Sequence, residues 1–170
     1  MRSLGLALIL LSASPALAGA QAAPSRERVR EMLSGIEHTP SDADWRRVGD
    51  GALPVLIELS QDTREPPYVR LRAVGATGAF PRAAVRTFLL AVARAPGQSD
   101  LLVREAVVTL ARAFGPAAVD DLAPFLAHDE VVVRDAAVRA LGRIGTPEAL
   151  ARQARERDPV VRERIDAALR

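Results

Sequence analysis

Cysteine and lysine are absent from this 170-residue chain, and aromatic residues make up only 4% of it. Without cysteine there can be no disulfide, no thiolate metal site and no thiol nucleophile. With so few aromatic side chains, the core must be built from Ala, Val and Leu, which suit closely packed helices better than a β-sandwich. These absences predict an all-α protein that is stable through side-chain packing alone.

Histidine is also scarce, and the familiar catalytic motifs are missing. His38 and His128 fall beside expected turns with no ligand partner nearby in the sequence, so we interpret both as solvated loop residues. Asp120 and Asp121 are adjacent on an expected helix, where their side chains point about 100° apart and cannot share a proton. There is no Gly-rich phosphate loop, serine nucleophile elbow or HExxH motif. We therefore predict no enzymatic activity, no cofactor and no metal.

The charges nearly balance, with 23 arginines against 21 acidic residues and a formal net charge of +2. The sequence pI of about 10.2 reflects the high pKa of arginine and not a strong positive field near neutral pH. Nucleic acid is therefore not an expected partner.

The first twenty residues have the pattern of a secretory leader. Arg2 precedes an apolar run from Leu4 to Leu11, and Ala16 and Ala18 form an A-x-A cleavage pattern. The run is too short to span a bilayer, which takes about 20 apolar residues. We predict a signal peptide over residues 1–18, with cleavage after Ala20 as the alternative. The mature protein is then periplasmic or secreted, without a membrane span.

A helix, a tight turn and a second helix are predicted over residues 129–150. Asp129 can cap the first helix, and its apolar residues recur at helical spacing at Val133, Ala137, Ala140, Leu141 and Ile144. Asp135, Arg139 and Arg143 share the opposite face of that helix. Gly145 can end it, and Thr146-Pro147-Glu148 has the composition of a helix start.

A Val-Arg pair marks each repetition of this unit, at separations of 34, 30 and 28 residues. The pairs are Val69-Arg70, Val103-Arg104, Val133-Arg134 and Val161-Arg162, and an acid precedes each within four residues. Repetition at this period is typical of a helical solenoid, because one helix pair needs stacked neighbours to bury its apolar face.

With these residues, the chain over about 41–170 resembles the HEAT-repeat family, in particular the short bacterial HEAT-like repeats also seen in phycobilin lyases. The resemblance implies a right-handed α-α superhelix of about four helix pairs plus a C-terminal half-repeat, with the second helices lining the concave side. It also implies that Arg70, Arg104, Arg134 and Arg162 are structural, in a ladder with the repeated acids. The expected organisation is a signal peptide (1–18), a linker with a polar N-terminal helix (19–40) and the repeat domain (41–170). A compact helical bundle is the alternative all-α fold.

Local features refine this expectation. Ser25 can cap a polar helix that reaches about Ile36, and Ser41 and Asp44 have capping-box spacing ahead of Trp45, the expected plug of the N-terminal end. Thr77 lies between Gly75 and Gly78, so the first helix of that unit is expected to fray. Pro124 should kink or shorten its helix.

The predicted function is that of an exported, non-catalytic scaffold that binds a protein partner. The candidate surface combines charges expected to point outward from the second helices: Arg82, Arg86, Arg94, Asp120, Asp121, Arg152 and Arg155. A lyase-like chaperone or accessory subunit acting on a partner protein is the alternative, followed by a nucleic-acid-binding HEAT-like protein. The last helix has an apolar stripe, which either caps the core of a monomer or mediates self-association.

Overall fold

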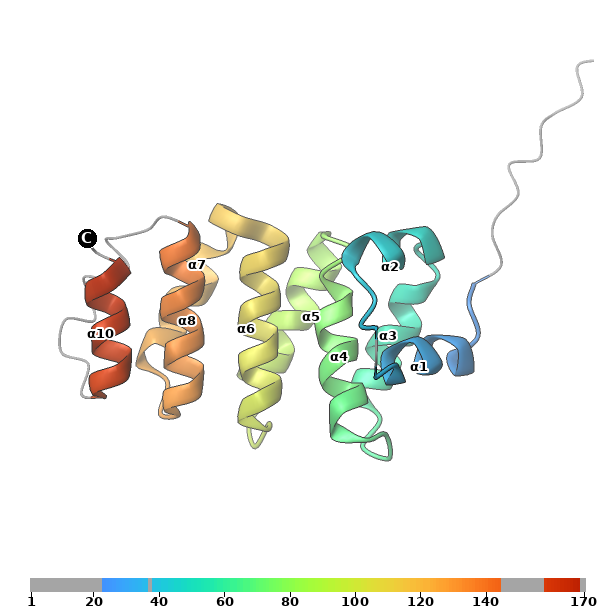
Figure 1. Cartoon of the computed structure of the whole chain (residues 1–170), viewed down its shortest axis with the longest axis horizontal. Helices are drawn as coiled ribbons and strands as arrows, with labels where there is room; N and C mark the ends of the chain where they lie inside the picture. Colours follow the sequence, from blue (N-terminus) through green and yellow to red (C-terminus); the bar gives the residue numbers. More distant parts are fainter. Residues whose placement is uncertain (1–22, 37, 145–157, 169–170) are drawn as a thin grey trace, which may run out of the picture.

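The computed structural model describes residues 23–36, 38–144 and 158–168, and all regular elements in these ranges are helical (Figure 1). The repeat helices are α4 (Pro67–Thr77), α5 (Ala83–Arg94), α6 (Asp100–Phe114), α8 (Val131–Ile144) and α10 (Pro159–Ala168). The expected second helix of the fourth unit and the signal peptide lie outside the described residues. No helix among the described residues is long and apolar enough to cross a bilayer.

Three helices precede α4, and the starts of the first two follow the predicted caps. Helix α1 (Arg26–Ser34) is capped by Ser25, whose hydroxyl accepts a hydrogen bond from the Arg28 amide at 3.2 Å. Helix α2 (Asp42–Val48) begins with the capping box of Ser41 and Asp44, and α3 spans Ala52–Gln61. Ile36, expected in the apolar stripe of the first helix, lies beyond the end of α1 and is 95% exposed.

The segment between α6 and α8 is split into three short pieces. These are a 3₁₀ turn, η1 (Gly115–Ala118), one α-helical turn, α7 (Val119–Leu122), and a second 3₁₀ turn, η2 (Ala123–Ala127). Pro116 and Pro124 lie in the first turn of η1 and η2, where a missing N–H is tolerated, but neither can continue a preceding α-helix. The prediction that Pro124 shortens this helix is confirmed.

Helices α4, α6, α8 and α10 lie side by side in one row, and α3, α5 and α7 lie behind them in a second row (Figure 1). The main packing contacts join α4 to α6, α6 to α8 and α8 to α10 within the first row. Across the rows they join α3 to α4, α5 to α6 and α7 to α8. Packing between neighbours along the chain is the arrangement of an α solenoid, so this prediction is confirmed against the compact bundle.

The core is continuous from α1 to α10 and consists mainly of small aliphatic side chains. All four valines of the Val-Arg pairs are buried, with exposed fractions of 0–4%. Trp45 is 2% exposed and belongs to the same core, as do Val29 and Leu33 of α1. Full burial of side chains such as Leu33 stabilises the fold by about 1.5–3 kcal/mol each, so α1 is anchored to the core of the repeats.

The expected fraying of α4 is wrong, because its glycines serve close packing. The helix continues to Thr77, whose fully buried hydroxyl donates to the Val74 carbonyl at 2.7 Å. A Cβ on Gly75 would lie 2.6 Å from Oε1 of Glu105, and one on Gly78 would lie 2.8 Å from the buried Thr109 methyl group. Both contacts are with α6. The glycines therefore let α4 and α6 approach each other closely.

Two arginines of the Val-Arg pairs bind backbone carbonyls of the preceding segment. Arg70 Nε donates to the Ser60 carbonyl at 3.1 Å, and Arg134 Nη1 donates to the carbonyls of His128 and Asp129 at 2.7 Å each. Each bond ties the first turn of a repeat helix to the chain that leads into it. These hydrogen bonds give Arg70 and Arg134 structural contacts.

Candidate partner-binding surface

The charged surface predicted from the second helices is partly neutralised within the protein. Arg86 Nε lies 2.6 Å from Oδ2 of Asp121, which joins α5 to α7, and this hydrogen bond raises the pKa of Arg86. Arg82 Nη2 lies 2.9 Å from Oδ2 of Asp50, and its guanidinium stacks over the Phe80 ring at 5.8 Å. Two of the three arginines on this row are thus engaged by neighbouring side chains.

The remaining members of the predicted surface do not form one basic patch. Arg94 is exposed at the end of α5, where it lines a hollow together with three acids, Asp100, Asp129 and Glu130. Asp120 is exposed on α7. Arg152 and Arg155 lie outside the described residues. Of the residues predicted here, the structure brings only Arg86 and Asp121 into contact.

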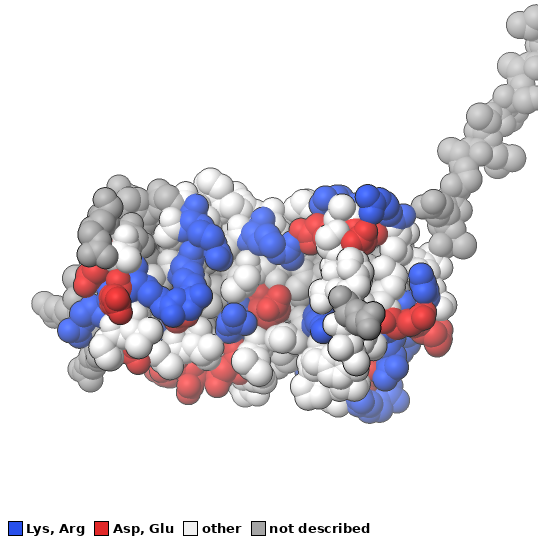
Figure 2. Space-filling model, viewed as in Figure 1, with Lys and Arg blue, Asp and Glu red and all other residues white. Residues whose placement is uncertain are grey.

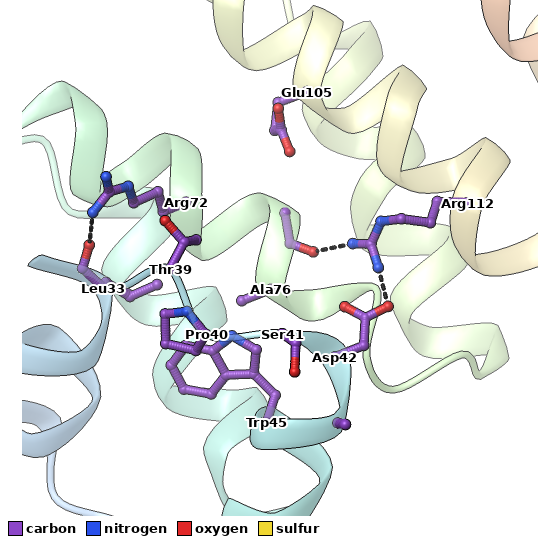
Figure 3. Close-up of a pocket in the computed structure, with 12 residues that line it drawn as sticks. Leu33, Thr39, Pro40, Ser41, Asp42, Trp45, Arg72, Ala76, Glu105 and Arg112 are labelled. Carbon is purple, nitrogen blue, oxygen red and sulfur yellow. Dashed lines mark hydrogen bonds and ion pairs between the residues drawn. The ribbon is translucent and has the colours of Figure 1, made fainter. Parts of the chain in front are cut away.

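Along the row of α4, α6, α8 and α10, the hollows follow one another more continuously than along the row of α5. The first of these is a cleft of about 510 Å³ between α2, α4 and α6, seen in Figure 3. Trp45 and Pro40 lie on one side of it, and Arg112 and Glu105 of α6 lie on the other (Figure 3). The cleft is mostly apolar, with charged groups contributed by α2, α4 and α6.

Two arginines hold this cleft together by binding helix ends. Arg112 Nη2 donates to the Gly75 carbonyl at 2.7 Å, and its Nη1 pairs with Asp42, so that α6 is linked to both α4 and α2 (Figure 3). Arg72 Nη1 donates to the Leu33 and Gly35 carbonyls at 2.7 Å each. These bonds reach carbonyls at the C-terminal ends of α1 and α4, so that each arginine connects a helix end to a neighbouring helix.

Burial affects the carboxyl group of Glu105, which lines this cleft. The group is partly buried against Gly75, and this desolvation raises the pKa of Glu105. The positive charges of Arg104 and Arg112 act in the opposite direction on its pKa, but less strongly. Deprotonation of Glu105 therefore carries a cost in the folded protein.

Two further hollows continue from the cleft along the first-helix row. The second lies between α6 and α8 and shares Arg112 with the cleft. The third lies between α8 and α10 and shares Arg143 with the second. We call these two hollows together the arginine furrow. They are lined by Val108, Ala111, Arg112, Gly115, Pro116, Val138, Arg139, Ala140, Gly142, Arg143, Ile144, Arg164 and Ala167.

The arginine furrow is positively charged. The described residues of its lining include four arginines and no acid, although Asp42 pairs with Arg112 from outside the lining, and Figure 2 shows basic side chains gathered over α6, α8 and α10 on this face. Beside it, Asp135 lies 3.0 Å from Nε of Arg139 and 2.7 Å from Nε of Arg164, which orients both side chains. Arg143 is exposed, and its side chain has no hydrogen bond or ion pair within the part of the chain that the structure describes.

A family model for HEAT repeats matches residues 97–170. This part of the chain is therefore similar to HEAT repeats, in agreement with the resemblance seen in the sequence. The match spans α6 to α10, so it includes every helix that lines the arginine furrow. HEAT repeats commonly mediate protein interactions. A search of curated proteins found no match.

Sequence reasoning placed Arg139 and Arg143 on one helix face but did not connect them with Arg112 and Arg164. The four arginines occupy different positions relative to the Val-Arg pair of their units. Repeat alignment therefore does not reveal that they meet, since the stagger between helices decides it. In the described ranges, no group of three or more His, Asp or Glu side chains is arranged to hold a metal ion.

Proposed function

We propose that this protein is an exported, non-catalytic scaffold that holds a protein partner on the row formed by α4, α6, α8 and α10. The arginine furrow is the observation that carries this proposal, because it is a continuous charged depression next to an apolar cleft. The row on α5 is the weaker candidate, since Arg82 and Arg86 already have partners within the protein and Arg94 lines a hollow with three acids. Three arginines of the furrow also have internal partners, but Arg143 has none among the described residues.

The proposed location outside the cytoplasm rests on the leader pattern of residues 1–18. Intact-mass measurement of the protein from its native cell envelope tests it. A mass that begins at Gly19 or Gln21 supports export, whereas a full-length mass from a cytosolic fraction contradicts it.

Photo-crosslinking in the native envelope tests the binding face. A photoreactive phenylalanine is placed at Ala167, an exposed residue of the furrow, or at Thr87, an exposed residue of α5. We expect a defined protein adduct from position 167 and none from position 87. The adduct should be lost with the additional substitution Arg143→Glu.

The two positions also distinguish the alternatives. An adduct only from position 87 assigns binding to the second helices, and no adduct from either position contradicts the scaffold proposal. Turnover of a small molecule by the purified protein alone would contradict the non-catalytic role.

A further inference from the structure

We propose that the arginine furrow binds an extended acidic segment of the partner, in polyproline II conformation with an acid at every third residue. This inference rests on the proposed scaffold function and adds the chemistry of the bound segment.

The charge of the furrow requires an acidic ligand. Among the described residues four arginines and no acid line it. From outside the lining, Asp42 offsets part of the charge of Arg112 and Asp135 offsets part of the charge of Arg139 and Arg164, so a positive excess remains. Arg143 lies at the junction of the two hollows, with its guanidinium unpaired among the described residues. A guanidinium has five N–H donors in a planar fork that matches a carboxylate, so Arg143 is the expected anchor.

The repeat geometry indicates the spacing of the acids. The furrow crosses α6, α8 and α10 in turn, and packed helices have axes about 8–10 Å apart. A polyproline II chain has three residues per turn and rises about 3.1 Å per residue, so every third side chain returns to the same side after about 9 Å. Acids at this interval can reach successive inter-helix positions of the furrow.

The floor of the furrow suits the residues between the acids. Val108, Ala111, Val138 and Ala167 present small apolar surfaces there, and proline rings or other compact side chains can pack against them. A proline-rich segment also loses little conformational entropy on binding, because it is already extended.

The same lining argues against single-stranded nucleic acid. Binding of bases uses aromatic side chains as stacking platforms, and none of the residues that line the furrow is aromatic. The whole chain has a net charge of only +2, which is weak for a backbone-binding protein.

Fluorescence anisotropy with the mature protein tests the proposal. The probe is a labelled peptide of four Glu-Pro-Pro repeats, compared with a peptide of the same composition in which the four glutamates are contiguous, and with a 12-nucleotide oligothymidylate. We expect the repeat peptide to bind more tightly than both comparators, and more weakly as salt increases.

Two charge-matched variants locate the binding. Arg143→Glu should lower the affinity for the repeat peptide by about tenfold or more, which is the loss expected when a hydrogen bond to a charged group is removed. Arg94→Glu changes the net charge equally but lies on the other row, and it should have less than about a twofold effect. Arg143→Gln should give an intermediate loss, and circular dichroism should report unchanged helicity for all three.

Each contrary result overturns the proposal. Equal weakening by Arg143→Glu and Arg94→Glu indicates unspecific attraction by net charge, and equal affinity for the two peptides removes the spacing. Tighter binding of the oligothymidylate assigns the furrow to nucleic acid. Absence of peptide binding, with a protein adduct still formed at position 167, refutes the acidic segment and leaves the scaffold. Failure of both crosslinks refutes the scaffold itself.

Discussion

Gly78→Ala should destabilise the protein by about 1–2 kcal/mol, whereas Gly75→Ala should be neutral or stabilising. Both glycines face α6 from the end of α4. At Gly78 the new methyl group would lie 2.8 Å from the Thr109 methyl group, which is fully buried, and 2.6 Å from Arg112 Nη2. The buried threonine cannot move aside, so the helices must separate or an overpacked contact must persist.

The magnitudes follow from opposing effects. Overpacking in a well-packed core costs about 1–3 kcal/mol, and the higher helix propensity of alanine returns up to about 1 kcal/mol. At Gly75 the close atom is Oε1 of Glu105, at 2.6 Å, the end of a flexible side chain that can rotate away. The propensity gain of about 0.5–1 kcal/mol then dominates at Gly75.

Urea denaturation of the mature protein, followed by circular dichroism, measures both variants. The free energies of unfolding of the two variants should change in opposite directions or differ by more than about 1 kcal/mol, at an unchanged m-value. An unchanged or higher midpoint for Gly78→Ala would refute the close-packing explanation. Equal destabilisation by the two substitutions would show that the backbone conformation requires glycine at both positions, and that the close contact with Thr109 is not the cause.

Three further predictions concern the N-terminal helices and the cleft. Leu33→Ala should cost about 2–4 kcal/mol in the same urea assay, because α1 belongs to the core, whereas Ile36→Ala, at an exposed site, should stay within about 0.5 kcal/mol. Ser41→Ala should lower stability by about 1 kcal/mol through loss of the capping box, and equal stability would contradict that role. Glu105→Gln should raise the free energy of unfolding most at neutral pH. Burial raises the pKa of Glu105 in the folded state, so the wild-type protein loses stability as pH rises through that pKa, and glutamine removes this loss. This advantage should shrink toward pH 4, and a pH-independent difference, or the same profile for Glu163→Gln on α10, would contradict the cause.

Local and periodic features of this protein could be predicted from its sequence. Ser25, the capping box of Ser41 and Asp44, and Pro124 act on backbone groups within a few residues, so their effects do not depend on distant packing. The Val-Arg period predicted the solenoid, because a repeated apolar face can be buried only by stacking copies of the same unit. These signals were sufficient for the fold class and for the resemblance to HEAT repeats.

Residues with partners on other helices could not be assigned in this way. Gly75 and Gly78 resemble helix-breaking residues until α6 is placed against them, and Arg86 resembles a free surface charge until α7 brings Asp121 within 2.6 Å. The predicted surface on α5 therefore remains a prediction with two of its arginines already engaged.

The arginine furrow depends on tertiary structure for the same reason. Helical periodicity determines which face of its own helix a side chain occupies, so Arg143 could be assigned to the polar face of α8 from sequence. The axial stagger and rotation of α6, α8 and α10 determine which side chains from different repeats line one depression. Those quantities arise from the fit of whole helix surfaces, and short-range sequence patterns do not encode them.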